Sequence, residues 1–310
     1  MAMKYLLYTI LAGLLLSSCE SDDDSNTIPV RDRQEVFDEN IIDLETYLST
    51  HFYNYEDFDP ANPSDFEIVI DTLAGANADK IALIDRPELE RLSITRDEVD
   101  YEYFVLKVRE GEGALRPTYA DSTLISYRGF NLQNEVFDEA QNPLWLDLPN
   151  TIAGFSLGLT EFKESTDRVQ NPDGTFTFEN SGMGVIFMPS GLAYFNNPPN
   201  NTIGQYNPIA FSIKLRTVEI TDHDGDGILS IYEDLNNDRN LRSGDADDTD
   251  GDGISNFLDA DDDGDGISTR EEISDEDGNL LILNGDPSTA PDSDNDGIPD
   301  YLDNRTEASS

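Results

Sequence analysis

Residues 122–138 read STLISYRGFNLQNEVFD, and this stretch decides the fold of the middle of the chain. Its first part, Ser122–Gly129, predicts a β-strand. Phe137 follows Tyr127 at a distance of ten residues. Another strand is predicted over Ile209–Leu215, because apolar and polar residues alternate there as they do in a half-buried strand.

A further strand is predicted over Tyr101–Arg109, and a short helix is predicted between the strands. The residues that share one face of this helix are Ile152, Phe155, Leu159 and Phe162. Gly154 and Gly158 weaken the helix by about 1 kcal/mol each relative to alanine. Several antiparallel strands with one short helix predict an α+β domain.

Four blocks of this region, in this order, resemble the motifs of the FKBP-type peptidyl-prolyl isomerases. They are Ile125–Gly129 with Val136–Asp138, Thr151–Phe155 with Gly158–Leu159, Pro189–Tyr194, and Ile209–Ile213. The resemblance covers residues 101–217 and implies an FKBP-like antiparallel sheet around a short helix, in a domain placed at residues 98–221. It also implies catalysis of cis–trans isomerisation at X-Pro bonds, whose barrier of about 18–20 kcal/mol makes the uncatalysed reaction slow.

The resemblance implies a dry aromatic pocket that works without a metal, a cofactor or a nucleophile. The prolyl ring would be held by Tyr127, Phe137, Ile152, Phe155 and Phe211. Tyr194 would donate a hydrogen bond to a substrate carbonyl, and Asp138 would orient the pocket. Alternatively, the aromatic residues form only the core of a small barrel. Tyr194 and Asp138 fit that alternative poorly, because a buried phenol or carboxylate needs polar partners.

The chain departs from the family pattern at several positions. The replacements are Phe155 for a tryptophan, Phe195 for a glycine, Gly204-Gln205 for a Pro-Pro pair and Leu144 for a frequent phenylalanine. Glu164–Gly182 is longer than in most of the family, and its Asn-Pro-Asp-Gly sequence at residues 171–174 predicts a hairpin or flap. These changes bear on catalytic rate and macrolide affinity more than on the fold.

A 12-residue pattern repeats through residues 222–303, with acids at positions 1, 3 and 5, glycine at 6 and an acid at 12. Such loops bind Ca²⁺, and position 7 contributes its backbone carbonyl. A degenerate copy starts at Asp234, with Arg239 in place of glycine, and a partial copy starts at Asp275. The predicted ligands in the four complete copies are Asp222, Asp224, Asp226, Ile228 and Glu233; Asp248, Asp250, Asp252, Ile254 and Asp259; Asp261, Asp263, Asp265, Ile267 and Glu272; and Asp292, Asp294, Asp296, Ile298 and Asp303.

The copies start 12 to 17 residues apart, which leaves no room for the flanking helices of paired EF-hands. The repeat resembles thrombospondin type 3 repeats, which implies a chain wound around successive, structural calcium ions. Residues 222–310 carry 28 acidic and 4 basic residues, so divalent cations would offset strong repulsion. The alternative is a disordered acidic linker, but disorder does not require glycine at position 6.

The N-terminal residues predict a targeting signal. Lys4 precedes a 12-residue apolar stretch that is too short to span a bilayer, and residues 1–18 therefore read as a signal peptide. Leu16-Ser-Ser-Cys19 resembles a bacterial lipobox, which implies a lipid on Cys19, the single cysteine of the chain. The alternative is a secretory signal with an incidental thiol. Residues 19–30 contain the acidic run Asp22-Asp23-Asp24 and are interpreted as a solvated tether. The alternative is that this run resembles the acidic export signal of Bacteroidetes surface lipoproteins.

Composition excludes other classes of function. Asp and Glu number 65 against 19 Lys and Arg, and this net charge of −46 makes nucleic acid an unsuitable partner. His51 and His223 are the only histidines, which leaves little material for a His-based triad or a catalytic zinc site. In the N-terminal extension, residues 31–97, an amphipathic helix is predicted over Asp32–Ser49 and a strand over Phe66–Leu73.

Together these observations predict a lipid-anchored protein of the cell envelope, at the outer membrane and exposed at the surface. It would be an extracytoplasmic peptidyl-prolyl isomerase that acts on proline-containing polypeptides and assists the folding of exported proteins. Calcium would stabilise its repeats, and residues 304–310 would form a short tail. The alternative function is an FKBP-like surface binding or adhesion module with little catalytic activity.

Overall fold

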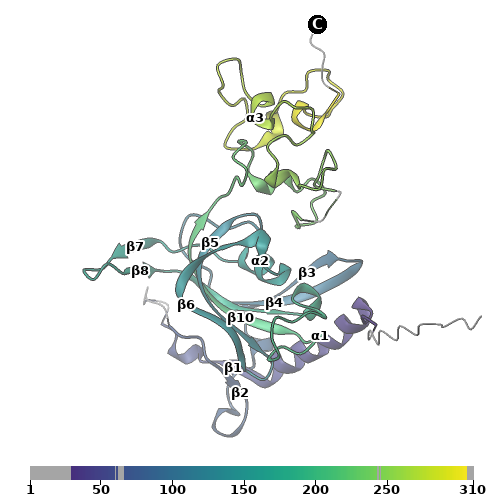
Figure 1. The fold of residues 1–310 in the computed structure, drawn as a ribbon. Helices are drawn as coiled ribbons and strands as arrows, with labels where there is room; N and C mark the ends of the chain where they lie inside the picture. Colours follow the sequence, from purple (N-terminus) through teal and green to yellow (C-terminus); the bar gives the residue numbers. More distant parts are fainter. Residues whose placement is uncertain (1–28, 60, 62–65, 243, 245, 306–310) are drawn as a thin grey trace, which may run out of the picture. The chain divides into compact units, whose positions relative to one another are not determined.

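The computed structural model describes residues 29–59, 61, 66–242, 244 and 246–305 (Figure 1). The predicted signal peptide, Cys19 and most of the tether and tail lie outside the described residues. In the described part of the chain, no helix has both the length and the apolar character needed to cross a membrane.

A six-stranded antiparallel sheet forms the centre of the fold, in the order β3-β4-β9-β10-β5-β6 (Figure 1). Its strands are β3 Leu89–Arg96, β4 Val99–Arg109, β5 Ser122–Asn131, β6 Val136–Asp147, β9 Gly182–Met188 and β10 Ile209–Glu219. Strands and helices together give the predicted α+β class. The predicted domain boundary at residue 98 falls inside a two-residue hairpin between β3 and β4. Asp97 and Glu98 of this hairpin both have positive φ, as tight hairpin turns require.

A short helix, α2 Ala153–Leu159, covers one face of the sheet at the position predicted from the sequence. A Cβ atom on Gly154 would lie 2.6 Å from Sδ of Met188, and one on Gly158 would lie 2.6 Å from the Ile186 side chain. The two glycines that lower helix propensity therefore allow α2 to approach strand β9 closely. Tertiary packing offsets the local disadvantage.

The other face is covered by the N-terminal extension. Helix α1 Arg33–Thr50 is capped by Asp32, whose Oδ1 accepts from the Glu35 amide at 2.9 Å. The predicted helix is thus confirmed. Its buried Leu44 and Leu48 pack in one cluster with the buried side chains of β4 and β9, among them Phe104, Leu106, Val185 and Phe187.

The remaining short elements complete this layer and the connections. β1 His51–Tyr53 pairs with β2 Ile70–Thr72, which is shorter than the strand predicted over Phe66–Leu73. In the predicted insertion, β7 Asp167–Gln170 pairs with β8 Phe176–Glu179, so the hairpin expected from Asn-Pro-Asp-Gly is present. Single 3₁₀ turns occur at Tyr55–Asp57, Gly75–Asn77, Leu83–Asp85, Leu148–Asn150 and Ser190–Leu192.

Strand β6 forms one edge of the sheet and leaves apolar side chains in solvent. Trp145, the only tryptophan of the chain, pairs with Leu124 of β5 and is 50% exposed. Leu144, at the position that departs from the family pattern, is 36% exposed. Neither side chain contributes to the buried clusters on the two faces of the sheet.

The helices in the described part of residues 222–303 are all short: Ser230–Glu233, Asn256–Leu258, α3 Thr269–Glu272, Pro287–Thr289 and Asp300–Leu302. A small apolar cluster of Ile228, Ile273, Ile282 and Tyr301 lies among them. So small a cluster buries little apolar surface, and the acidic loops dominate this part of the chain.

Replacing Gly184 by alanine should destabilise the sheet by about 1–3 kcal/mol. The new Cβ would lie 2.0 Å from the Leu106 carbonyl oxygen and 2.7 Å from the Phe162 ring. Gly174→Asn, at the tip of the β7–β8 hairpin, is the control, because no atom lies within 4 Å there and asparagine tolerates positive φ. Urea unfolding followed by circular dichroism should separate the two variants. Equal stability of Gly184→Ala and the wild type would contradict the close approach of β4 and β9.

Candidate functional site

Five aromatic rings meet on the α2 face of the sheet, where β5, β6 and β10 lie side by side. The ring centroids of Phe155 and Phe211 are 5.0 Å apart, and those of Phe137 and Phe211 are 5.4 Å apart. Tyr127 lies 6.0 Å from Phe155, and Tyr194 lies 6.5 Å from Phe137. All four contacts are edge-to-face, the arrangement that aromatic quadrupoles favour.

Strand register explains why these side chains share a face. Tyr127 pairs with Ile213, and Gly129 pairs with Phe211, in the β5–β10 ladder. A Cβ atom on Gly129 would lie 2.6 Å from the Phe137 ring and 2.7 Å from the Phe211 ring. The glycine of the sequence block therefore leaves the space in which two rings pack together.

A bulge in β6 brings Phe137 to the same face. Phe130 pairs with Val136 while Gly129 pairs with Asp138, so Phe137 is the extra residue between them. A bulge of this kind re-aims a side chain that regular alternation would place on the opposite face. Phe137 and Asp138 consequently both reach the aromatic cluster from consecutive positions.

The two tyrosine hydroxyls have different surroundings. The hydroxyl of Tyr127 donates to Oδ2 of Asp138 at 2.8 Å. Burial, followed by the hydrogen bond to Asp138, raises the pKa of Tyr127 to about 12, so this phenol stays a donor at neutral pH. The pKa of Tyr194 is also raised, by burial first and then by the charge of Asp138. Among the described residues its hydroxyl has no hydrogen-bond partner, and it remains able to donate to a ligand.

The structure thus brings together all seven residues that the sequence assigned to the pocket. Phe155 and Phe211 are 3% and 4% exposed and belong to the main buried cluster, so they serve as core. The half-buried members are Tyr127, Phe137, Ile152 and Tyr194, and Asp138 is exposed.

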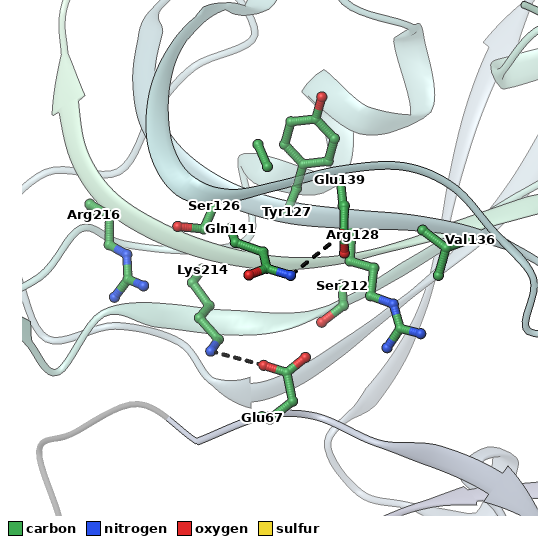
Figure 2. A pocket seen from close by; sticks show the side chains of 11 residues that line it. Glu67, Ser126, Tyr127, Arg128, Val136, Glu139, Gln141, Ser212, Lys214 and Arg216 are labelled. Atoms are coloured by element: carbon green, nitrogen blue, oxygen red, sulfur yellow. Dashed lines mark hydrogen bonds and ion pairs between the residues drawn. The ribbon is translucent and has the colours of Figure 1, made fainter.

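A separate groove of about 460 Å³ lies on the opposite face of the same strands (Figure 2). Arg128, Lys214 and Arg216 alternate along β5 and β10 with the residues of the aromatic face, and Figure 2 shows the Tyr127 ring pointing away from them. Nζ of Lys214 forms an ion pair with Oε2 of Glu67 at 3.3 Å. This groove was not predicted from the sequence, although the predicted alternation in β10 places Ser212 and Lys214 on one face of the strand.

The acidic repeats share one loop geometry. The position-1 carboxylate accepts from the amide of position 6 at 3.0–3.1 Å in each complete copy, starting at Asp222, Asp248, Asp261 and Asp292. The glycines at position 6 have φ between 95° and 112°, a region that favours glycine. Arg239 takes this place in the degenerate copy with φ 63°, and its amide donates to Asp234 at 2.9 Å.

The structure brings carboxylates together in five groups whose oxygens lie within 4.8 Å of one another. The groups are Asp224, Asp226, Glu233 and Asp262; Asp234, Asp238 and Asp247; Asp248, Asp250 and Asp252; Asp261, Asp263 and Asp265; and Asp292, Asp294 and Asp296. Predicted ligands that lie outside these groups are Asp222, Asp259, Glu272 and Asp303. Four members of these groups were not among the predicted ligands. Asp234 and Asp238 belong to the degenerate copy, Asp247 lies just before the copy that starts at Asp248, and Asp262 occupies position 2 of its copy, which the loop pattern leaves without a role.

The first group has the features of a cation site. Asp226, Glu233 and Asp262 are each 2% exposed, and the oxygens of Glu233 and Asp262 have no hydrogen-bond partner among the described residues. Burial first, and the neighbouring carboxylates next, raise the pKa of Glu233 to about 10 and that of Asp262 to about 9. Carboxylate oxygens suit a hard cation such as Ca²⁺, and the residues present fit that ion.

Comparisons with known proteins found one family model and several solved structures. The family model described as BamM C-terminal matches residues 223–286. No curated protein sequence matches the chain.

Several solved structures are similar to the chain. A peptidyl-prolyl cis-trans isomerase from Pseudomonas syringae pv. tomato has a TM-score of 0.33 and 19% identity, over 43% of this chain and 83% of that one. FkpA from Escherichia coli has a TM-score of 0.32 and 20% identity, over 43% and 53%. The N-terminal domain of FKBP42 from Arabidopsis thaliana has a TM-score of 0.30 and 15% identity, over 43% and 97%. The chain spans about half the length of FkpA.

Phe155→Ala and Tyr194→Phe should differ strongly in stability. The first removes a buried ring that contacts two other rings, and should lower the free energy of unfolding by about 3–5 kcal/mol. The second removes a hydroxyl without a protein partner and should change it by less than about 0.5 kcal/mol. Urea unfolding of both variants measures the difference. A loss of more than 1 kcal/mol for Tyr194→Phe would mean that its hydroxyl supports the fold.

Proposed function

We propose that the protein is a peptidyl-prolyl cis-trans isomerase of the FKBP type that binds proline-containing polypeptides in the aromatic cluster. The observation that carries the proposal is the combination of apolar rings with one unpartnered hydroxyl, that of Tyr194, beside the paired Tyr127 and Asp138. A site built only as core would have no reason to hold a free phenol at its edge.

The proposed chemistry needs no bond to be made or broken. Twisting an X-Pro amide removes its resonance, so the transition state has less charge separation than the planar ground state. Rings that exclude water favour this less polar state over the planar amide. Tyr194 would hold a substrate carbonyl through a hydrogen bond, and Tyr127 would stay in place through Asp138. Phe155 and Phe211 would support the prolyl ring from below.

The setting of this activity is also a proposal. The lipobox-like Leu16-Ser-Ser-Cys19 supports lipid anchoring in the cell envelope, at the outer membrane and exposed at the surface, where the client proteins would be exported polypeptides. The acidic groups of residues 222–303 support the binding of structural Ca²⁺. Calcium sites of extracellular modules have Kd values of about 10⁻⁴–10⁻³ M, so their occupancy would depend on the calcium concentration outside the cell.

A proline-peptide assay coupled to a conformation-specific protease tests the isomerase. The wild type should accelerate cis-to-trans conversion, and Tyr194→Phe should lower kcat/KM by about fivefold, since one hydrogen bond contributes about 1 kcal/mol. Ser212→Ala is the matched control, because it changes the residue next to Phe211 on the opposite face of β10. A folded wild type without activity would favour the alternative, an FKBP-like surface binding or adhesion module.

Metabolic labelling with palmitate tests the anchor separately. Label should enter the wild type and be lost in Cys19→Ser, because the chain has one cysteine. The variant should also leave the membrane fraction. Equal labelling of both proteins would rule out Cys19 as the lipidated residue and leave the isomerase proposal intact.

A further inference from the structure

Asp262 is the second residue of the copy that starts at Asp261, a position that provides no ligand in a 12-residue calcium loop. Its carboxylate lies with those of Asp224, Asp226 and Glu233 from the first copy, all within 4.8 Å. We propose that Asp262 is a ligand of the first copy's calcium ion, so that one ion ties two segments nearly 30 residues apart in sequence. The inference rests on the calcium binding in the proposed function.

Burial separates this group from an ordinary acidic surface. Asp226, Glu233 and Asp262 are each 2% exposed, whereas acids in the Asp248 and Asp292 groups include exposed members. Both carboxylate oxygens of Glu233 and of Asp262 lack a partner among the described residues. Unpaired buried carboxylates strongly destabilise a fold, and a cation among them removes that penalty.

No side chain of the described residues takes the place of that cation. Arg270 is near Asp226, but its guanidinium donates to the backbone carbonyl of that residue at 3.4 Å, and within the described part of the chain it forms no ion pair with the four carboxylates. Four carboxylates and the backbone carbonyl of Ile228, at position 7, offer enough oxygen ligands for the six to eight that Ca²⁺ takes.

The packing around the group supports a junction between copies. Ile228, at position 7 of the first loop, is fully buried in the cluster with Ile273. At position 7 of the next two complete copies, Ile254 and Ile267 are 44% and 45% exposed. The amide of Asp262 donates to Oγ1 of Thr269 at 3.1 Å. This bond fixes the backbone from which Asp262 reaches the first copy.

Calcium titration of the full chain by calorimetry tests the proposal. Asp262→Asn and Glu233→Gln should each weaken the same site by about tenfold or more, because ligand charge sets affinity. The double variant should affect the same single site and leave the stoichiometry of the other sites unchanged, since both residues serve one ion. Glu276→Gln is the matched control: it also occupies position 2 of a copy, the one starting at Asp275, and it is exposed. It should bind as the wild type does.

Thermal unfolding distinguishes a calcium ligand from a residue that only supports the fold, because the change in melting temperature should reverse its direction when calcium is added. Asp262→Asn should raise the melting temperature in chelator, where it removes the cost of burying an unpaired acidic side chain, and lower it in saturating calcium. Hydrogen exchange should show that calcium protects residues 261–269 less in Glu233→Gln than in the wild type, because only the ion of their own copy, at Asp261, Asp263 and Asp265, then remains to protect them. This second variant decides the matter if Asp262→Asn does not fold.

Two failures are distinguishable. A wild type that binds no calcium would overturn the calcium part of the proposed function together with this inference. Normal binding by Asp262→Asn, with a site lost in Glu233→Gln, would overturn the inference alone and leave the first copy as a self-contained loop. Calcium protection of residues 261–269 that is equal in Glu233→Gln and the wild type would do the same.

Discussion

A strand that is closed to water on both faces needs a covering layer on each side, and β9 imposes this constraint on the fold. All seven of its residues are buried. Helix α2 closes one face through the contact of Gly158 with Ile186, and helix α1 closes the other. The N-terminal extension therefore supplies the cover of one face of the sheet and is not an appendage, and β3 from the same segment completes one edge of the sheet.

The aromatic site depends on backbone features more than on the rings themselves. Gly129 leaves room for two rings, and the bulge at Phe137 turns two consecutive side chains toward one face. Gly129 itself contributes no side chain that would touch a substrate. Substitutions that close the space at Gly129 or straighten β6 would therefore remove the site while leaving its aromatic residues in the sequence.

Local pattern was enough to predict α1, α2 and the strands β4, β5 and β10, because periodicity and turn residues act over short distances. The seven residues of the aromatic cluster followed from the resemblance to the FKBP-type motifs, and β3, β6 and β9 were not predicted. The bulge at Phe137 could not be predicted, since it depends on how β6 pairs with β5. The position of Asp262 was missed for a related reason. Spacing within a 12-residue loop gives no information on which distant loop an extra carboxylate meets. The structural role of residues 31–97 was also not predicted. It depends on the second face of the sheet, which these residues cover.

The exposed edge of β6 has a practical consequence for spectroscopy. Trp145 is the only tryptophan and is half exposed. It lies outside the aromatic cluster, in which Phe155 is buried. Intrinsic fluorescence excited at the indole band would therefore report on the edge strand and its solvent, and peptide binding in the cluster would leave the emission nearly silent. A tryptophan placed at residue 155 would give the cluster an emission signal of its own, with Trp145 as an internal reference in the same chain.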